Sequence, residues 1–190
     1  MAAVPISDSP APLSLGSAWW SLNSFVESAF ESAMLGEWED AADLYNRFEE
    51  VRVATIIRTG DTLLHLAVSS RVEGNVKLLT GRIPRYRSRK ILGMGNKSGD
   101  TPLHLAAALG MRKACLDMAR RCPELLTQVR NEHGETPLFK AARHGQRETF
   151  RAMQRAALAA GSSLFDLGCC RKSGGDTVLH VALLEEHYGT

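Results

Sequence analysis

The chain has 190 residues, of which 44% are hydrophobic and 23% are charged, and its formal net charge is +2. These values are ordinary for a folded protein. No apolar run approaches the ~20 residues that a membrane-spanning helix needs. The first residues lack the basic start and apolar core of a secretory signal peptide, and the four cysteines do not have zinc-site spacing. We therefore expect a protein of the cytoplasm or the nucleus.

The first 58 residues predict a leader followed by a helical cap. The opening stretch "MAAVPISDSPAPLSLG" is rich in Pro, Ser and Ala, which is typical of disorder, so we expect a disordered leader over residues 1–20. Ser24 and Glu27 fit a capping box at the start of a helix, and Gly36 can end it. Apolar residues then recur at helical spacing in "EWEDAADLYNRFEE". Residues 21–58 therefore predict an N-terminal capping pair of helices with a polar outer face.

From residue 59 onwards one motif occurs four times. It reads "GDTLLHLAV" from Gly60, "GDTPLHLAA" from Gly99, "GETPLFKAA" from Gly134 and "GDTVLHVAL" from Gly175. Repetition at such intervals indicates a repeat array, and T-P-L-H-x-A is the ankyrin signature. Residues 59–190 thus resemble ankyrin repeats, and the expected fold is an all-α solenoid of stacked helix-turn-helix units.

Each letter of the motif has a structural role. Threonine is a good N-cap, proline at the first helical position costs no hydrogen bond, and paired alanines let neighbouring helices approach. Gly110 and Gly145 suit a left-handed residue that ends the first helix of a unit. A second helix is expected after each turn. The residues given this structural role are Thr62, His65, Thr101, Pro102, His104, Thr136, Pro137, Thr177 and His180.

The histidine of the motif recurs at His65, His104 and His180, and Phe139 replaces it in the third copy. A catalytic or metal-binding histidine is not expected once per repeat, so we predict a structural role. In ankyrin proteins, which the motif resembles, this histidine holds loop backbone between repeats.

The stretch "GMGNKSGDTPLHLAA" (Gly93–Ala107) has the composition of a phosphate-binding loop, but its spacing is wrong. A P-loop needs glycine directly before the lysine, where Asn96 stands, and the dinucleotide pattern G-x-G-x-x-G also fails. We therefore expect a turn, no nucleotide cofactor and no metal. No nucleophile–base pair lies outside the repeated residues, so the sequence indicates a protein that is not an enzyme.

Charge is distributed unevenly along the chain. Residues 1–61 hold ten acidic and three basic residues, whereas residues 62–190 hold eleven and twenty. The segment "RIPRYRSRK" (residues 82–90) concentrates five of the cations, Arg82, Arg85, Arg87, Arg89 and Lys90. A solvated loop is the simplest interpretation. The alternatives are contact with an acidic protein or an anionic membrane surface, or binding of nucleic acid, although no nucleic-acid motif accompanies the segment.

The fourth copy of the motif stands close to the end of the sequence. It supplies a first helix to about His187, and the sequence stops at Thr190. The expected last repeat is therefore incomplete, with exposed apolar residues and weak protection against exchange.

The longer stretches "ESAMLGEWEDAADLY", "NEHGETPLFKAARHG" and "SGGDTVLHVALLEEHYG", taken with the other copies of the motif, resemble the plant ankyrin–transmembrane family. Its members, of the PGG-domain, accelerated-cell-death-like kind, carry ankyrin repeats followed by a membrane region. The resemblance covers roughly residues 24–189 and implies a cytosolic protein-binding role in plant defence or stress signalling. Leu63 and Val178 stand where the motif has proline, Arg71 where it has a turn glycine, and no transmembrane segment follows.

Two functions are consistent with the sequence. The first is a non-enzymatic scaffold that binds a protein partner, and the second is a binder of nucleic acid or an anionic membrane surface through residues 82–90. By the family resemblance, ankyrin partners meet loop tips and the exposed side of the first helices. These positions are Arg58, Ser70, Lys97, His133, Arg143, His144 and Lys172.

Overall fold

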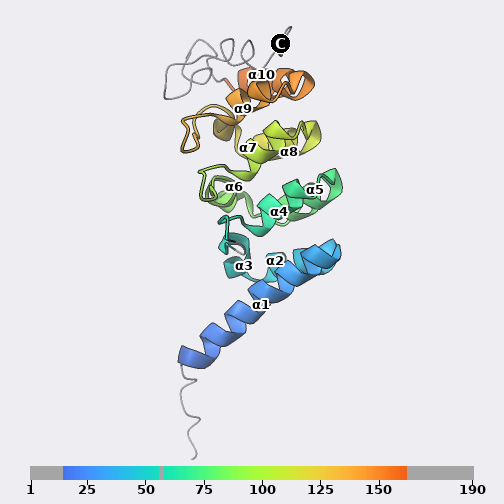
Figure 1. The fold of residues 1–190 in the computed structure, drawn as a ribbon, viewed down its shortest axis with the longest axis vertical. Helices are drawn as coiled ribbons and strands as arrows, with labels where there is room; N and C mark the ends of the chain where they lie inside the picture. The colour runs from blue at the N-terminus through green and yellow to red at the C-terminus, as the bar shows by residue number, and fades with distance from the viewer. Residues whose placement is uncertain (1–14, 56–57, 162–190) are drawn as a thin grey trace, which may run out of the picture.

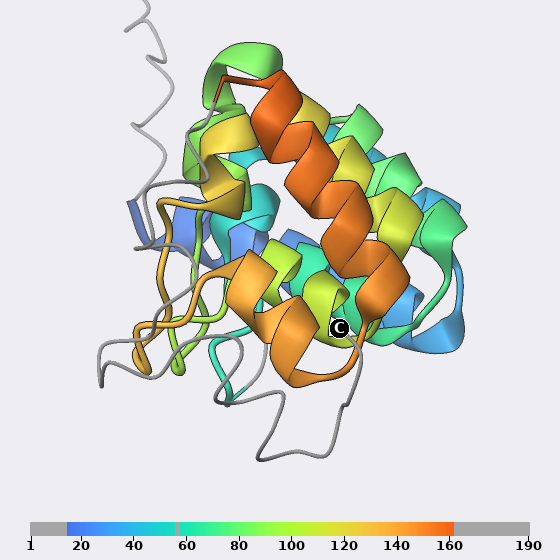
Figure 2. The same ribbon diagram turned by 90° about the horizontal axis from the view of Figure 1, so that it is seen from above.

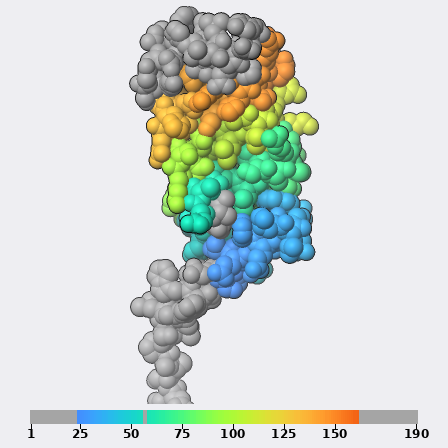
Figure 3. All heavy atoms as spheres, in the orientation of Figure 1, coloured from blue at the N-terminus to red at the C-terminus, as the bar shows by residue number. Residues whose placement is uncertain are grey.

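The computed structural model describes residues 15–55 and 58–161, with residues 15–23 described by backbone alone. All regular structure in these ranges is helical, in agreement with the all-α expectation, and a single bridge joins Thr55 to Thr62. The helices are arranged in pairs stacked along the long axis of the molecule (Figure 1). In the space-filling view the units form successive layers in chain order (Figure 3).

Three rows of helices run along this stack (Figures 1 and 2). The inner row consists of α1 (Leu15–Leu35), α4 (Leu63–Ser69), α7 (Pro102–Ala108) and α9 (Pro137–Arg143). The outer row consists of α2 (Trp38–Arg47), α5 (Glu73–Gly81), α8 (Arg112–Arg121) and α10 (Arg147–Ala159). A third row of short helices follows the outer helices: α3 (Glu49–Val53), η1 (Arg85–Arg87) with α6 (Ser88–Leu92), and η2 (Pro123–Leu126).

The inner helices α4, α7 and α9 each begin at the threonine of the motif. The Thr101 hydroxyl accepts a hydrogen bond from the His104 amide, and the Thr136 hydroxyl accepts one from the Phe139 amide at 3.1 Å. Both helices have proline at their first position, where its missing amide proton costs nothing. The helices α4, α7 and α9 are only seven residues long, so their stability comes from packing rather than from helix propensity.

A residue with positive φ follows each inner helix and turns the chain into the outer helix. Gly36, Gly110 and Gly145 supply φ values of 86°, 73° and 65°, as expected of left-handed C-cap glycines. Arg71 occupies the equivalent position after α4 with a φ of 58°. It is the only described non-glycine residue with positive φ, and an L-residue in this conformation is strained.

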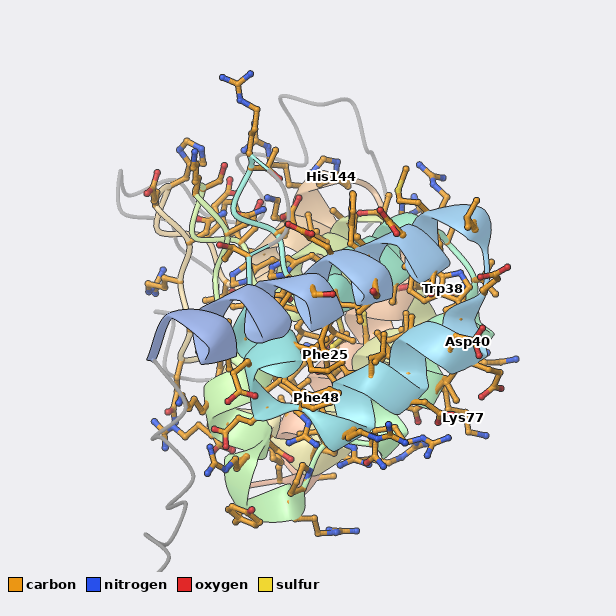
Figure 4. All side chains as sticks on the ribbon, turned by 90° about the horizontal axis from the view of Figure 1, so that it is seen from below. Phe25, Trp38, Asp40, Phe48, Lys77 and His144 are labelled. Atoms are coloured by element: carbon orange, nitrogen blue, oxygen red, sulfur yellow. The ribbon has the colours of Figure 1, made fainter. Side chains whose placement is uncertain are left out.

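The core is continuous through the described units. The motif leucines Leu64, Leu103 and Leu138 are fully buried between the inner and outer rows. The alanine pairs of α7 and α9 are also buried, and their small side chains allow adjacent inner helices to pack closely. At the N-terminal end the rings of Phe25 and Phe48 stack with centroids 4.1 Å apart (Figure 4). Each unit therefore buries its apolar face against its neighbours.

Two expectations require correction. The first helix begins at Leu15, not after residue 20 or at Ser24, because a run of Leu, Ala and Trp extends the helical stretch towards the N-terminus. Residues 85–90 of the basic segment are not a loop but lie in η1 and α6, because Ile83, Ile91 and Leu92 are buried in the core. Residues 1–14 of the expected leader and the whole fourth copy of the motif, with Lys172, Thr177 and His180, lie outside the described residues.

Candidate partner-binding surface

The loops that precede the inner helices are joined to one another by backbone hydrogen bonds. The Lys97 amide donates to the Thr59 carbonyl at 2.9 Å, and the Glu132 amide donates to the Ser98 carbonyl at 3.0 Å. The two bonds occupy equivalent positions in successive units. Each acceptor lies one residue before the glycine of its own loop (Gly60 or Gly99), and each donor lies two residues before the glycine of the next loop (Gly99 or Gly134). The three glycines have positive φ, and each permits the same tight turn. The loop tips are therefore held in a regular row along one edge of the stack (Figure 2).

An asparagine shapes each of the loops that precede α7 and α9 and ties it to the loop before. Asn96 Oδ1 accepts the amides of Ser98 and Asp100, while its Nδ2 donates to Asp61 of the preceding loop at 2.8 Å. Asn131 repeats the arrangement and donates to Asp100 at 2.8 Å. This link was not anticipated from the sequence. Its signal is the recurrence of Asn five residues before Thr in "NKSGDT" and "NEHGET".

The motif histidines form a second link between units. His104 Nδ1 accepts from the Thr101 amide at 3.1 Å, and its Nε2 donates to the Glu135 carbonyl of the next loop at 3.0 Å. His65 does the same with Thr62 and with the Asp100 carbonyl, at 3.1 and 2.9 Å. Both rings are fully buried. Burial lowers the pKa of both imidazoles, that of His104 to about 4, so each is a neutral Nε2–H tautomer at neutral pH.

The third unit has two ion pairs on its inner helix. Lys140 replaces the leucine found at this motif position in α4 and α7, and its Nζ pairs with Asp100 of the preceding loop. Arg143 pairs with the buried Glu135 at 2.6 Å. Burial alone would raise the pKa of Asp100, but hydrogen bonds from Lys140 and Asn131 outweigh it and hold that pKa below its usual value. Asp100 is therefore the carboxylate at which these links between successive units converge.

The proposed site residues lie in two groups. Arg58, Lys97 and His133 are exposed at the loop tips. Ser70 and His144 are exposed, and Arg143 half-buried, at the far ends of the inner helices. Between the groups lies a row of half-buried residues that was not predicted as part of the site, Leu66, Leu105 and Lys140. We call the surface made of these loop tips, this row and these helix ends the open face.

The basic segment is largely partnered within the third row of helices. Arg87 pairs with Glu49 of α3, and Arg89 lies 3.7 Å from Glu124 of η2. Arg82 lies 3.7 Å from Asp43 of α2. Arg85 and Lys90 are exposed and have no ion-pair partner among the residues that the structure describes. The segment is thus bracketed by carboxylates from the units on both sides.

The lysine-containing turn leaves no amides for a phosphate. The Lys97 amide is bonded to Thr59, those of Ser98 and Asp100 to the Asn96 side chain, and that of Gly99 to the Asn96 carbonyl. Within residues 15–55 and 58–161 no three His, Cys, Asp or Glu side chains are grouped to hold a metal ion. No helix in the same ranges is long and apolar enough to cross a membrane.

Comparison with protein-family models and with curated proteins gives no match to this chain.

Proposed function

We propose that this chain is an ankyrin-repeat protein that binds a protein partner on its open face and performs no catalysis. The observation that carries the proposal is the row of loops joined by equivalent bonds, Lys97 to Thr59 and Glu132 to Ser98. A surface held in one conformation before binding loses little conformational entropy when a partner docks.

The composition of the open face supports a protein partner. Half-buried Leu66 and Leu105 provide apolar contact area at its centre, and the exposed Arg58, Lys97 and His133 surround it with polar groups. An apolar centre with a polar rim is the usual arrangement of a protein interface. Catalysis has no support, because His65 and His104 are buried and bonded through both ring nitrogens.

The resemblance to the plant ankyrin–transmembrane family extends this proposal. By that resemblance the partner belongs to defence or stress signalling, and the binding takes place in the cytoplasm or the nucleus. The second candidate, a binder of nucleic acid or an anionic membrane through residues 82–90, has less support. Three of its five cations face carboxylates, and only Arg85 and Lys90 remain for a polyanion.

A pull-down with matched charge reversals tests the two candidates against each other. The chain, an Arg58→Glu/Lys97→Glu variant and an Arg85→Glu/Lys90→Glu variant serve as baits in plant extract, and quantitative mass spectrometry counts the captured proteins. Both variants change the net charge equally. Under the proposal the loop variant loses the captured partner and the basic-segment variant retains it.

The opposite pattern would support the second candidate. In that case the binding of RNA or of phosphatidylserine vesicles should weaken steeply with salt, because counterion release drives such binding. A capture that is equal for all three baits would remove the open face as the site.

A further inference from the structure

Over the residues that the structure describes, the outer face of the stack, opposite the open face, carries opposite charges at its two ends. We propose that two copies of this chain associate through their outer faces in an antiparallel, two-fold arrangement. In it, the acidic end of each copy lies over the basic end of the other. This self-association is separate from partner binding and leaves both open faces exposed.

The acidic end is formed by α2. Glu39, Asp40 and Asp43 are exposed there, with Arg47 as the one cation of the helix. Asp40 and Trp38 lie on the same side of the molecule as Lys77 of α5, away from His144 (Figure 4).

The basic end is formed by α8 and α10. Its exposed cations are Arg112, Lys113, Arg120, Arg147, Arg151 and Arg155. Two carboxylates stand among them, Asp117 at 2.5 Å from Arg120 and Glu148 at 3.7 Å from Arg151. Cations therefore outnumber carboxylates on both helices, whereas α5 between the two ends has one of each, Glu73 and Lys77.

When a second copy lies antiparallel to the first, this order of charges brings opposite charges together at both ends of the pair. Along the outer row the helices are acidic, neutral, basic and basic, so turning a second copy end over end places α2 of each copy over α10 of the other, and α5 of each copy over α8 of the other. The two contacts are then identical, as a closed two-fold dimer requires. The carboxylates within the basic end disfavour a uniform polyanion such as a nucleic acid or an anionic membrane.

The acidic end also has a groove that fits arginine side chains. The space between α2 and α5 measures about 690 Å³ and is lined by Trp38, Glu39, Gly74, Leu78 and Gly81, among others. A tryptophan face and a carboxylate together bind a guanidinium group by cation–π and charge-assisted contacts. Lys77 and Arg82 also line the groove, but Arg82 faces Asp43, so we assign the arginine contacts to the α2 wall.

Two glycines keep this groove open. A Cβ on Gly81 would meet no atom within 4 Å, and one on Gly74 would meet only the Val72 side chain at 3.9 Å. Neither glycine has positive φ, so no turn requires it. Gly74 is the second residue of α5 and Gly81 its last, and at either place glycine loses more backbone freedom on folding than alanine would. No close contact and no positive φ in the fold requires glycine at these two positions. Binding of side chains from a second copy would require the space that the glycines leave.

Sedimentation velocity and light scattering on the full chain test the proposal. At about 100 µM protein and about 50 mM NaCl the mass should be twice that of the monomer, and it should fall to the monomer at about 500 mM, where exposed charges are screened. Glu39→Arg/Asp40→Arg and Arg151→Glu/Arg155→Glu should each be monomeric at low salt, because like charges then face each other in both contacts.

An equimolar mixture of the Glu39→Arg/Asp40→Arg and Arg151→Glu/Arg155→Glu variants tests the antiparallel arrangement most directly. Both contacts of a mixed pair are again between opposite charges, so the mixture should recover the dimer mass. The Arg58→Glu/Lys97→Glu variant, with the same charge change as the α10 variant, should dimerise like the unaltered chain. Circular dichroism melts verify that every variant is folded.

A monomer at low salt, or a dimer that both reversals leave intact, would overturn the proposal. If the mass of the unaltered chain rises beyond that of a dimer, the chains associate in an open head-to-tail array and the two-fold pair is wrong. None of these outcomes bears on the pull-down, whose loop variant alters the opposite face.

Discussion

The imidazole of His104 bridges two successive units: Nδ1 accepts from the amide of Thr101, which caps its own helix, and Nε2 donates to the Glu135 carbonyl at 3.0 Å. One buried ring thus fixes the start of α7 and the loop that leads into α9.

Replacing His104 with alanine should lower the free energy of unfolding by about 1–3 kcal/mol, because the Glu135 carbonyl and the Thr101 amide lose their buried partner. Urea denaturation of the variant measures this loss. His133→Ala, which removes an exposed imidazole from the loop tip, is the control and should leave stability unchanged. An unchanged midpoint for His104→Ala, with partner capture abolished, would instead make His104 a binding residue.

Stability should fall on acidification below pH 6.5. Burial lowers the pKa of His104 from 6.5 to about 4, so between these values the unfolded chain binds a proton that the folded chain does not. The free energy of unfolding therefore decreases as the pH falls through this window. The lowered pKa of Asp100 acts in the same direction only at lower pH, below its ordinary value of 3.8. Urea midpoints measured from pH 7 to 4 for the chain and for His104→Phe, which copies the third unit, should show a shallower dependence in the variant.

Arg71→Gly should stabilise the chain by about 0.5–1 kcal/mol. Arg71 holds a φ of 58° at the turn after α4, a conformation that is costly for an L-residue and nearly free for glycine. Differential scanning calorimetry should show a higher melting temperature for Arg71→Gly than for the unaltered chain, and no increase for Arg71→Ala. Equal melting temperatures for the glycine and alanine variants would mean that this turn carries no strain.

ATP or NAD at millimolar concentration should leave the melting temperature unchanged. The amides of Lys97, Ser98, Gly99 and Asp100 are already bonded within and between loops, so these residues have no free backbone amide to form a phosphate cradle. A ligand that bound the folded chain would raise the melting temperature in a saturable way. Thermal melts over a nucleotide titration detect such a rise, which would restore the phosphate-loop interpretation.

The sequence predicted the helices well because their ends depend on local chemistry. Thr101 and Thr136 cap helices, and Gly110 and Gly145 end them, through backbone preferences that act within a few residues. The bonds from Asn96 to Asp61 and from Asn131 to Asp100 join residues 35 and 31 positions apart. Such pairs emerge only when the units are stacked.

The basic segment shows a different limit of sequence-based prediction. Its five cations favoured the prediction of a solvated loop. The structure of the segment is instead determined by the buried residues among and beside them, Ile83, Ser88 and Ile91. Glu49 and Glu124, which pair with Arg87 and Arg89, come from the units before and after. A local reading of charge therefore overestimated how much of this surface is available to a polyanion.

Residue-resolved hydrogen exchange of the Lys97 and Glu132 amides tests the central claim, a rigid row of loop tips, most directly. Both amides sit in exposed residues, so in independent surface loops they would exchange at the rate of an unstructured peptide. Their bonds to Thr59 and Ser98 predict slow exchange, comparable to amides within α7, since opening requires neighbouring units to separate. Fast exchange at both amides, with α7 still protected, would contradict the account.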